Sequence, residues 1–467
     1  MNPALAFIVT ASFACSSPRA ANAPIAETRP NIILVMTDDQ GYGDVGHRDH
    51  AHLQTPTLDE LASRALRFER FYAAAPVCSP TRASCLTGRH PYRLGITGAN
   101  SGHMRDEELT LAESLKAHGY RTGHFGKWHL GTLTTEITDS NRGGPEHAGH
   151  FAPPWLHGFE RCFSTEAKVP TYDPMITPPM WAGGVGKKEE GTPYGTAYWN
   201  ERGEVVDEGL EGDDSRIIMD RALSFIDASV QRKDSFLAVI WLHAPHLPVL
   251  AGEDQLARYK SIEDREQRHY FACITSLDQQ LGRLRAKLAQ LDVAQDTMLW
   301  FCSDNGPEGA AGKAPGSAGG LRGRKRSLFD GGIRVPAYLE WPARFPEPRV
   351  IDAPCVTSDI VPTVLAALNI PLPERPLDGI DLAPLLDGEV TTRSRSIGFR
   401  SSKMAVWMED RLKLVRSGQK VMLFDIPSDP SESSDLAQQD PESVQRLSAE
   451  LDSWIQACDE SRDGKDY

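Results

Sequence analysis

The chain has 467 residues, of which 40% are hydrophobic and 24% are charged, and its formal net charge is −14. These values exclude a largely disordered or collagen-like protein and leave room for one large domain with a smaller one. The negative charge argues against a nucleic-acid-binding protein, which ordinarily carries an overall basic surface. We therefore expect no nucleic-acid partner, although a locally basic pocket could still bind an anionic substrate.

An apolar run over residues 4–14 is too short to span a bilayer as a helix, yet it has the length of a signal-peptide core. Small residues follow it as far as Ala23. We predict a signal peptide over residues 1–23 and export to the periplasm or the extracellular space, with no membrane span. Cys15 is an alternative attachment site for a lipid anchor.

Three short apolar runs indicate strands that are buried on both faces of a parallel sheet. They cover residues 31–36, 236–242 and 297–302. Between and after these strands, helical periodicity is found over residues 57–68, 110–118, 215–228 and 265–291. Alternating strands and helices predict an α/β fold, with a large and mostly parallel central sheet flanked by helices.

Polar side chains follow the predicted strands at their carboxyl ends. Asp38 and Asp39 follow the first, His246 follows the second, and Asp304 and Asn305 follow the third. Open α/β sheets place their active sites at this edge. Asp-Asp pairs also occur in ordinary caps and turns, but oxygen donors at two strand ends suit a hard divalent cation.

Two further regions have their own character. Residues 141–203 are rich in Gly, Pro, Trp and Tyr and show little periodicity, which predicts a long insertion that shapes a binding site. Near the C-terminus, residues 404–415 and 420–425 alternate like a hairpin, and residues 441–456 are amphipathic. We predict a catalytic domain over residues 24–390 and a small α+β subdomain with an antiparallel sheet over residues 391–467.

A cysteine motif is the most informative feature of the chain. Cys78 is followed by Pro80 and Arg82, and the segment continues to Leu86-Thr87-Gly88-Arg89. This pattern resembles the maturation signal of type I sulfatases. The alternatives for Cys78 are a buried free cysteine near a turn and a disulfide with Cys85.

The resemblance implies an alkaline-phosphatase-like fold and a cysteine that a formylglycine-generating enzyme oxidises to an aldehyde. In this family the formylglycine hydrate attacks the sulfur of a sulfate ester beside a bound divalent cation. Carried onto this chain, the nucleophile is formylglycine from Cys78, and the ion is Ca²⁺ or Mg²⁺. The metal ligands implied are Asp38, Asp39, Cys78, Asp304 and Asn305.

Other family motifs assign the remaining roles. The segment Gly126 to Gly131 matches the second signature, in which Lys127 binds sulfate and His129 regenerates the aldehyde. On extended backbone these two side chains would point the same way. His246 matches the histidine at the ester oxygen, Lys325 matches the lysine that binds sulfate and protonates the leaving group, and Arg82 would hold the aldehyde hydrate.

The resemblance covers most of the chain and predicts a sulfuric ester hydrolase acting on a sulfated carbohydrate. Arg324 and Arg326 depart from the family pattern. They are either a solvated basic turn or extra charge for a second sulfate or a uronate, and His243 is either a core residue or a sugar contact. The alternatives for function are a phosphonate or phosphodiester hydrolase of the same superfamily and a catalytically silent protein that binds sulfated sugars.

Overall fold

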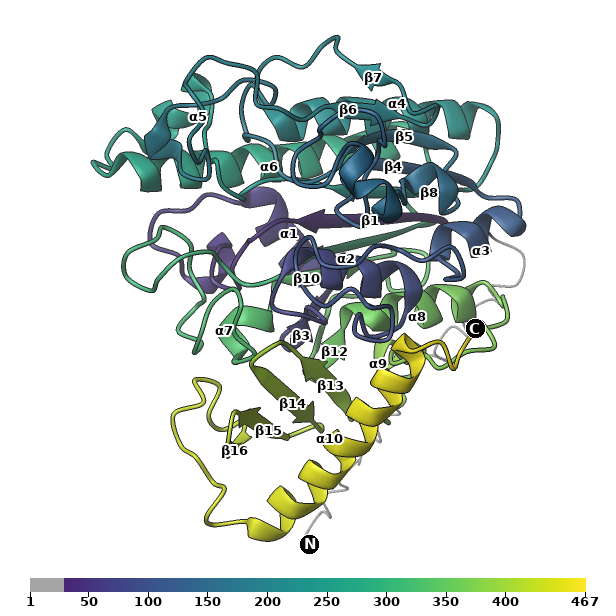
Figure 1. Ribbon diagram of the computed structural model, residues 1–467, viewed down its shortest axis with the longest axis vertical. Coiled ribbons are helices and arrows are strands. Elements are labelled where there is room, and N and C mark those ends of the chain that lie inside the picture. Colours follow the sequence, from purple (N-terminus) through teal and green to yellow (C-terminus); the bar gives the residue numbers. More distant parts are fainter. Residues whose placement is uncertain (1–28) are drawn as a thin grey trace, which may run out of the picture.

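A ten-stranded, mostly parallel sheet forms the centre of the protein in the computed structural model, which describes residues 29–467 (Figure 1). The strand order is β11-β2-β10-β9-β1-β8-β4-β5-β6-β7. In chain order these strands are β1 (Asn31–Thr37), β2 (Leu66–Phe68), β4 (Arg121–Lys127), β5 (Arg161–Thr165), β6 (Tyr198–Asn200), β7 (Val205–Val206), β8 (Phe236–Trp241), β9 (Thr297–Ser303), β10 (Ala337–Glu340) and β11 (Arg349–Ile351).

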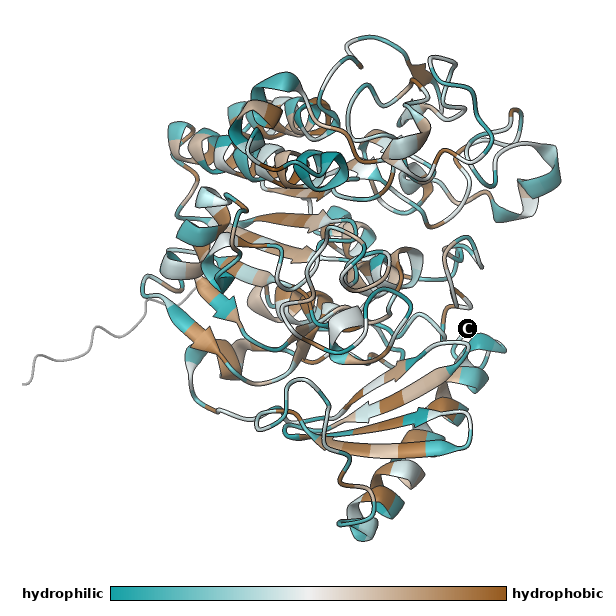
Figure 2. Ribbon diagram, turned by 90° about the vertical axis from the view of Figure 1, so that its left-hand side faces the viewer, coloured by the Kyte–Doolittle hydropathy of each residue, from teal (hydrophilic) through white to brown (hydrophobic). Residues whose placement is uncertain are grey.

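The central strands are parallel and buried on both faces, as their continuous apolar runs predict. β1 pairs in parallel with β9 on one side and β8 on the other, and β8 pairs in parallel with β4. Ile32 and Leu34 of β1 face one core cluster, whereas Ile33 and Val35 face the other. Full burial of such a side chain contributes roughly 1.5–3 kcal/mol to stability. Figure 2 shows the apolar strands in the interior.

Helices cover both faces of the sheet. On one face lie α1 (Pro56–Arg64), α4 (Asp214–Gln231) and α6 (Arg265–Gln290). On the other lie α2 (Cys78–Thr87), α3 (Leu111–Ala117) and α8 (Ile360–Ala367). A capping box, in which Thr110 and Glu113 each accept the other's backbone N–H, begins α3. The predicted α/β fold class is confirmed.

The remaining elements are a second, smaller sheet with its helix and several short elements. A four-stranded antiparallel sheet consists of β13 (Ile397–Arg400), β14 (Met404–Met408), β15 (Leu412–Ser417) and β16 (Lys420–Asp425), and α10 (Pro441–Arg462) packs against it (Figure 1). The short elements are β3 (Phe71–Tyr72), β12 (Cys355–Val356), α5 (Glu253–Leu256), α7 (Asp330–Ile333) and α9 (Ala383–Asp387). The antiparallel C-terminal sheet is confirmed; the predicted boundary at residue 390 stays a prediction.

Two details of the sequence interpretation are wrong. The helix predicted over residues 57–68 ends at Arg64, and residues 66–68 form β2, because Leu66 and Phe68 pair with β10 and enter the core. The insertion at residues 141–203 is not only loop, since it contributes β5 and β6 to the central sheet. Strands of three to five residues are too short for periodicity to reveal them.

The prediction of export depends on the N-terminal residues. The predicted signal peptide and Cys15 lie outside the described residues. Among residues 29–467, no helix combines the length and the apolar character needed to cross a bilayer.

Candidate functional site

The candidate site lies at the carboxyl ends of four adjacent parallel strands. In sheet order these are β9, β1, β8 and β4. The chain leaves them at Asp304, Asp38, Leu242 and Trp128, so residues separated by 266 positions become neighbours. The side chain of Asn305 donates to Asp39 Oδ1 at 2.7 Å, and the backbone N–H of Asp39 donates to Asp304 Oδ1 at 3.1 Å.

Two lysines pair with the two aspartates that follow β1. Lys127 Nζ, at the end of β4, lies 2.6 Å from Asp38 Oδ2. Lys325 Nζ reaches Asp39 from a loop that precedes α7 and lies 2.6 Å from Oδ1. All four side chains are at most 4% exposed. The site therefore holds buried, paired charges of both signs.

Arg82 connects three of the strand ends. Its guanidinium donates to Asp304 Oδ2 at 2.7 Å and to the carbonyl of Lys127 at 3.1 Å, and it lies 3.7 Å from Asp38 Oδ2. The side chain is fully buried. A planar guanidinium can serve several fixed oxygen acceptors at once, which suits this position.

Cys78 is the first residue of α2, four positions before Arg82, so both face the strand ends from the same helix. Potential ligand atoms of Cys78, Asp38 and Asp304 all lie within 4.8 Å of one another. Burial raises the pKa of the Cys78 thiol, although Lys127 and Lys325 oppose this shift. An unmodified thiol here is thus mainly protonated at neutral pH and is a weak nucleophile.

The loop that carries Lys325 approaches the strand ends through glycines. A Cβ atom on Gly306 would lie 2.0 Å from the carbonyl oxygen of Gly331, and one on Gly331 would lie 2.2 Å from that of Gly323. Any larger residue would push the loop away from Asn305. This close approach explains the glycines that surround the lysine motif in the sequence.

The charges in the cluster influence one another. Burial alone would raise the pKa of Asp38, but Lys127, His246, Arg82 and Lys325 hold it well below its ordinary value. Burial and the neighbouring charge of Asp38 raise the pKa of Asp304 to about 7, against the opposing effect of Arg82 and Lys127. Burial and carboxylate repulsion thus act against ionisation of Asp304, whereas the neighbouring cations keep Asp38 ionised.

The donor set fits a hard divalent cation. Two buried oxygens in the cluster, Asp38 Oδ1 and Asn305 Oδ1, have no hydrogen-bond partner within the protein. Such orphaned acceptors are costly unless something outside the chain satisfies them. Carboxylate and amide oxygens are the ligands that Ca²⁺ and Mg²⁺ prefer. Asp38, Asp39, Asp304 and Asn305 would therefore hold the ion, with Cys78 at the edge of this set.

Lys127 and His129, the two side chains of the second signature, do not lie on one stretch of extended backbone. β4 ends at Lys127, and His129 has a positive φ of 58°, so the expected alternation is broken after the strand. Even so, Cys78, Lys127 and His129 line one pocket. His129 Nε2 lies 2.7 Å from Asn100 Oδ1, whereas its buried Nδ1 has no partner. If Asn100 Oδ1 accepts a hydrogen bond from Nε2–H of His129, Nδ1 carries the free lone pair of the ring.

The two histidines after β8 have different surroundings. His246 lines the same pocket, donates through Nδ1 to the carbonyl of Leu247 at 2.6 Å, and lies 3.7 Å from Asp39. Burial lowers the pKa of His246 to about 4, and the nearby carboxylates only partly oppose this effect. His243 is fully buried and contacts Asp214 and Thr165 at 2.8 and 2.7 Å. His243 is thus a core residue.

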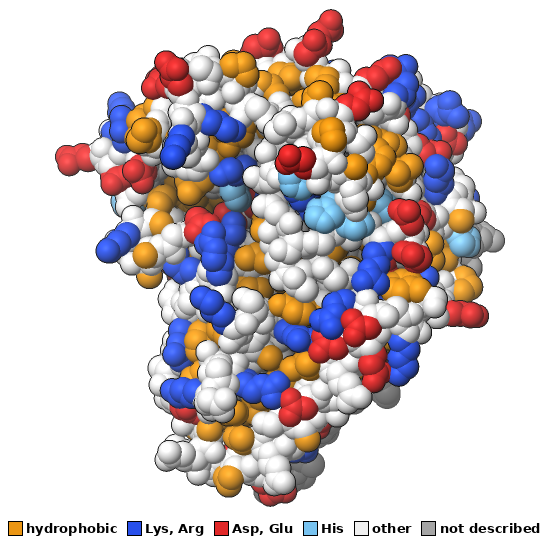
Figure 3. Space-filling model, in the orientation of Figure 1, with side chains coloured by type: hydrophobic (Ala, Val, Ile, Leu, Met, Phe, Trp, Pro, Cys, Tyr) orange, Lys and Arg blue, Asp and Glu red, His pale blue; other side chains and the backbone are white. Residues whose placement is uncertain are grey.

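The two extra arginines are already engaged with the protein. Arg324 donates to the backbone carbonyls of Glu308 and Gly316 at 2.7 and 2.8 Å. Arg326 forms a two-point pair with the carboxylate of Glu308 at 2.6 and 2.9 Å. Nε of Arg324 still has no hydrogen-bond partner, and Arg326 lines the pocket that contains Cys78, so both interpretations of these arginines stay predictions. Figure 3 shows basic and acidic side chains interspersed on this face.

Sequence reasoning missed several residues of the pocket. Asn100, Asn141, Lys168 and Glu308 line it together with Cys78. Asn141 and Lys168 lie in the insertion predicted to shape a binding site, but no motif marks them individually, and Asn100 and Glu308 belong to no motif. The disulfide alternative is not realised, because Cys78 and Cys85 are both free thiols.

Comparisons with known proteins agree on one family. A family model described as Sulfatase matches residues 30–370. Human arylsulfatase A is 34% identical over 80% of this chain and 71% of its own length. N-acetylgalactosamine-6-sulfatase from Sus scrofa is 32% identical over 78% of this chain and 67% of its own length.

Solved structures share the fold over most of the chain. Ps i-CgsB in complex with k-i-k-neocarrahexaose has a TM-score of 0.78 and 25% identity, covering 91% of this chain and 93% of that one. The phosphonate monoester hydrolase of Agrobacterium radiobacter has a TM-score of 0.63 and 20% identity, covering 92% of this chain and 96% of that one. The latter similarity concerns the fold alone.

Proposed function

The chain belongs to the sulfatase family and is a sulfuric ester hydrolase, and we propose that it releases sulfate from a sulfated carbohydrate with a formylglycine made from Cys78 as its nucleophile. The observation that carries this proposal is that the carboxylates and cations of the site converge on Cys78. A ring of oxygen donors and three buried cations surrounds its position at the start of α2.

An aldehyde at position 78 and a divalent cation would complete the chemistry. A hydrated aldehyde at position 78 would supply the oxygen that attacks sulfur, and a divalent cation held by Asp38, Asp39, Asp304 and Asn305 would withdraw charge from a sulfate oxygen. The support for the cation is the pair of orphaned oxygens on Asp38 and Asn305.

Positive charge for the sulfate comes from this chain's own side chains. Lys127, Lys325 and Arg82 place three cations within the cluster, each already oriented by a carboxylate. Fixed charges of this kind stabilise developing negative charge without reorganising at the moment of reaction. We propose that they bind the non-bridging oxygens.

Proton transfer falls to the other side chains of the site. His129, whose Nδ1 has no partner, is the proposed base for the group at position 78. Lys325 and His246 lie beside Asp39, and we propose that they serve the ester oxygen, with Lys325 as the proton donor for the departing alkoxide. Asp304 is the proposed base for the attacking hydroxyl.

The carbohydrate part of the proposal is supported by two of the similar proteins. Ps i-CgsB, whose fold matches closely, is described in complex with a neocarrahexaose, and another relative is named for a sulfated amino sugar. The experiment is a screen of sulfated oligosaccharides for sulfate release. Steryl-sulfatase is also a relative, at 30% identity, so a steryl sulfate belongs in the same screen as the competing class.

The aldehyde is tested by the mass of the tryptic peptide from Phe71 to Arg82, from protein made in a host that supplies the maturation enzyme. We expect a peptide lighter than the thiol form that reacts with carbonyl reagents. An unmodified cysteine in a fully active preparation would overturn the nucleophile.

The reaction class is tested by comparing an aryl sulfate with an aryl phosphodiester. We expect faster sulfate release, and a clear preference for the diester would favour a phosphodiester or phosphonate hydrolase. Saccharide binding without sulfate release, in protein that carries the aldehyde, would instead indicate a catalytically silent binding protein.

Export of the protein is likewise proposed, on the signal-like residues 1–23. Cell fractionation with and without that segment tests it, and retention of both forms in the cytoplasm would contradict it.

A further inference from the structure

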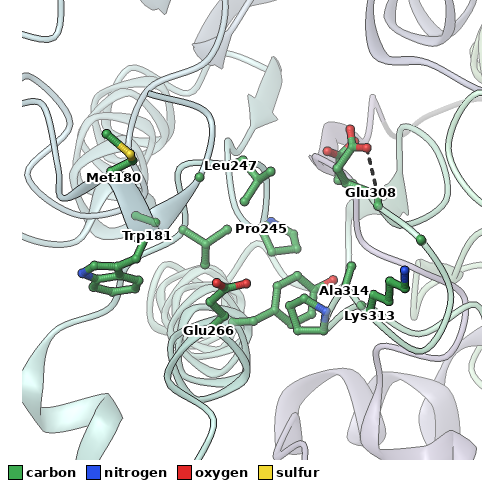
Figure 4. Close-up of a pocket in the computed structure, with 17 residues that line it drawn as sticks. Met180, Trp181, Pro245, Leu247, Glu266, Glu308, Lys313 and Ala314 are labelled. Atoms are coloured by element: carbon green, nitrogen blue, oxygen red, sulfur yellow. Dashed lines mark hydrogen bonds between the residues drawn. The ribbon is translucent and has the colours of Figure 1, made fainter. Parts of the chain in front are cut away.

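A second pocket adjoins the candidate catalytic site. It has a volume of about 420 Å³, Asp39 lies at its wall, and it shares Leu247 and Glu308 with the pocket that contains Cys78. Its walls come from residues 180–183, 245–249 and 308–316 and from one face of α6 (Figure 4). A molecule whose sulfate lies near Cys78 can therefore extend into this space without leaving the protein surface.

Most of the wall is apolar. Trp181, Pro245, Leu247, Val249 and Ala314 contribute to it. The indole of Trp181 is held in place, because the guanidinium of Arg265 lies 4.1 Å from its centroid and the ring of His269 lies at 4.7 Å. Such a wall favours a ring with an apolar face over a flexible polar chain.

The charged side chains that line this pocket offer no surplus of positive charge for a second anion. Glu308 is already paired with Arg326. Glu266 points up from α6 and Lys313 lies on the opposite side (Figure 4). Within residues 29–467 neither Glu266 nor Lys313 forms an ion pair, so they leave one free charge of each sign. A sulfate or carboxylate placed here would meet Glu266 as well as Lys313, so these two charges give it no net compensation.

We propose that this pocket binds the alcohol portion of the substrate, and that this portion is an uncharged ring with an apolar face. The inference rests on the proposed function, because it assumes that sulfate is cleaved at Cys78. It also opposes the second-sulfate interpretation of Arg324 and Arg326, whose guanidinium groups are bound to the protein itself.

The first experiment compares phenyl sulfate with 2-naphthyl sulfate. Their leaving groups have similar acidity, so the second ring mainly reports the pocket. We expect kcat/KM to favour the naphthyl ester by roughly tenfold, since filling an apolar pocket gives preferences of about this size. The Trp181→Ala variant should lower this ratio toward one, and Trp181→Phe should give an intermediate ratio.

Trp155→Ala is the matched control. Trp155 is a partly buried tryptophan that lines neither pocket, so its loss should leave the naphthyl-to-phenyl ratio at the wild-type value. A wild-type ratio near one, or an unchanged ratio in Trp181→Ala, would overturn the proposal. Because phenyl sulfate reports cleavage in every variant, these results leave the proposed function standing. Loss of cleavage of all sulfate esters in the wild type would instead overturn the proposed function.

The second experiment tests the charge argument with 2-naphthyl sulfate that carries a 6-sulfonate. We expect this ester to react at least about tenfold more slowly than the neutral naphthyl ester, because its extra anion meets Glu266. Glu266→Gln should recover part of that loss, so the rate of the sulfonated ester relative to the neutral ester should rise in this variant. Equal or faster turnover of the sulfonated ester by the wild type would show a site for a second anion and contradict the proposal.

A third comparison identifies the source of the ring. A monosulfated neutral methyl glycoside is measured beside 2-naphthyl sulfate in wild type and Trp181→Ala. A loss on both substrates supports a pocket that accepts sugar and aryl rings, and a loss on the naphthyl ester alone supports a pocket for aryl rings. If Trp181→Ala affects neither substrate, the pocket does not bind the alcohol portion.

Discussion

Among the buried charge clusters of residues 29–467, two are satisfied in different ways. The catalytic cluster consists of Asp38, Asp39, Arg82, Lys127, Asp304, Asn305 and Lys325. The subdomain cluster consists of Asp330, Lys413 and Glu432, at the junction of α7 with the C-terminal sheet. Both are almost inaccessible to water, so both would destabilise the fold if their charges were unpaired.

The subdomain cluster pairs its groups internally. Lys413 Nζ lies 2.6 Å from Asp330 and 2.8 Å from Glu432, and the second oxygen of Asp330 accepts a hydrogen bond from Tyr72 at 3.1 Å. Glu432 Oε1 also lacks a hydrogen bond, but it lies 2.8 Å from Lys413 Nζ, whereas Asp38 Oδ1 and Asn305 Oδ1 of the catalytic cluster have no hydrogen-bond partner. The difference teaches that the unsatisfied atoms, rather than buried charge itself, mark the place where an external group is expected.

The largest expected effect is on catalysis alone. Cys78→Ala should lower sulfate release by roughly 10³-fold or more, because no nucleophile remains, and should leave the free energy of unfolding within about 1 kcal/mol of wild type. Cys85→Ala removes a second buried thiol from the same helix and is the control for packing. Similar turnover in the two variants would rule out Cys78 as the source of the nucleophile.

The converse effect is expected in the subdomain cluster. Lys413→Met should reduce the free energy of unfolding by about 3–5 kcal/mol, because two buried carboxylates lose their partner. Urea denaturation measures this change, and the exposed Lys420→Met on the neighbouring strand should shift stability by less than about 0.5 kcal/mol. A loss below about 1 kcal/mol in Lys413→Met would mean that the cluster is not structural.

Lys325 lies between the catalytic cluster and the subdomain cluster, because it pairs with Asp39 and its loop leads into α7. Lys325→Ala should slow an alkyl sulfate by roughly 10²–10³-fold and an activated aryl sulfate considerably less, if the ammonium protonates the leaving group. The measurement is kcat/KM across a series of leaving groups. Equal losses on all esters would assign Lys325 to sulfate binding only.

Metal binding should stabilise the catalytic cluster without involving the subdomain cluster. At a Ca²⁺ concentration of about 100 Kd, the wild type should gain roughly 2.7 kcal/mol over chelated protein. Asp38→Asn should lose most of this gain, whereas Lys420→Met should keep it. A gain that survives in Asp38→Asn would place the ion elsewhere, and chelation that leaves turnover intact would refute the metal assignment.

The smallest effect concerns the contact between the main domain and α10. Burial lowers the pKa of His90 to about 3, and its ring lies 4.6 Å from that of Trp454. The unfolded chain binds a proton near pH 6.5, so below that pH the unfolded state gains protons that the folded state does not. Stability should therefore fall as pH drops from about 6.5 toward 3.

His90→Asn tests this expectation, because its oxygen can still accept from the backbone of Tyr92. From pH 7 to 5 the wild type should lose about 2 kcal/mol more than the variant. The measurement is urea denaturation at both pH values. Parallel losses in the two proteins would show that His90 does not contribute to acid sensitivity.

The sequence alone was sufficient for the fold class and for the residue types at the site. Continuous apolar runs identify β1, β8 and β9 because these strands are buried on both faces, and the acids after them mark one edge of a parallel sheet. The motif around Cys78 predicted the family. These features are local, so a single segment of chain carries each of them.

The tertiary structure alone decided which groups meet. Strand order brings Asp39 to Asn305 and Lys325 across more than 260 positions, and no local pattern encodes that pairing. Asn100 enters its pocket from a turn and Trp181 from a short 3₁₀ helix, neither of which has a detectable periodicity, and only folding places Glu308 beside Arg326. Side-chain partners depend on packing between distant segments, and packing is determined only when the whole chain is folded.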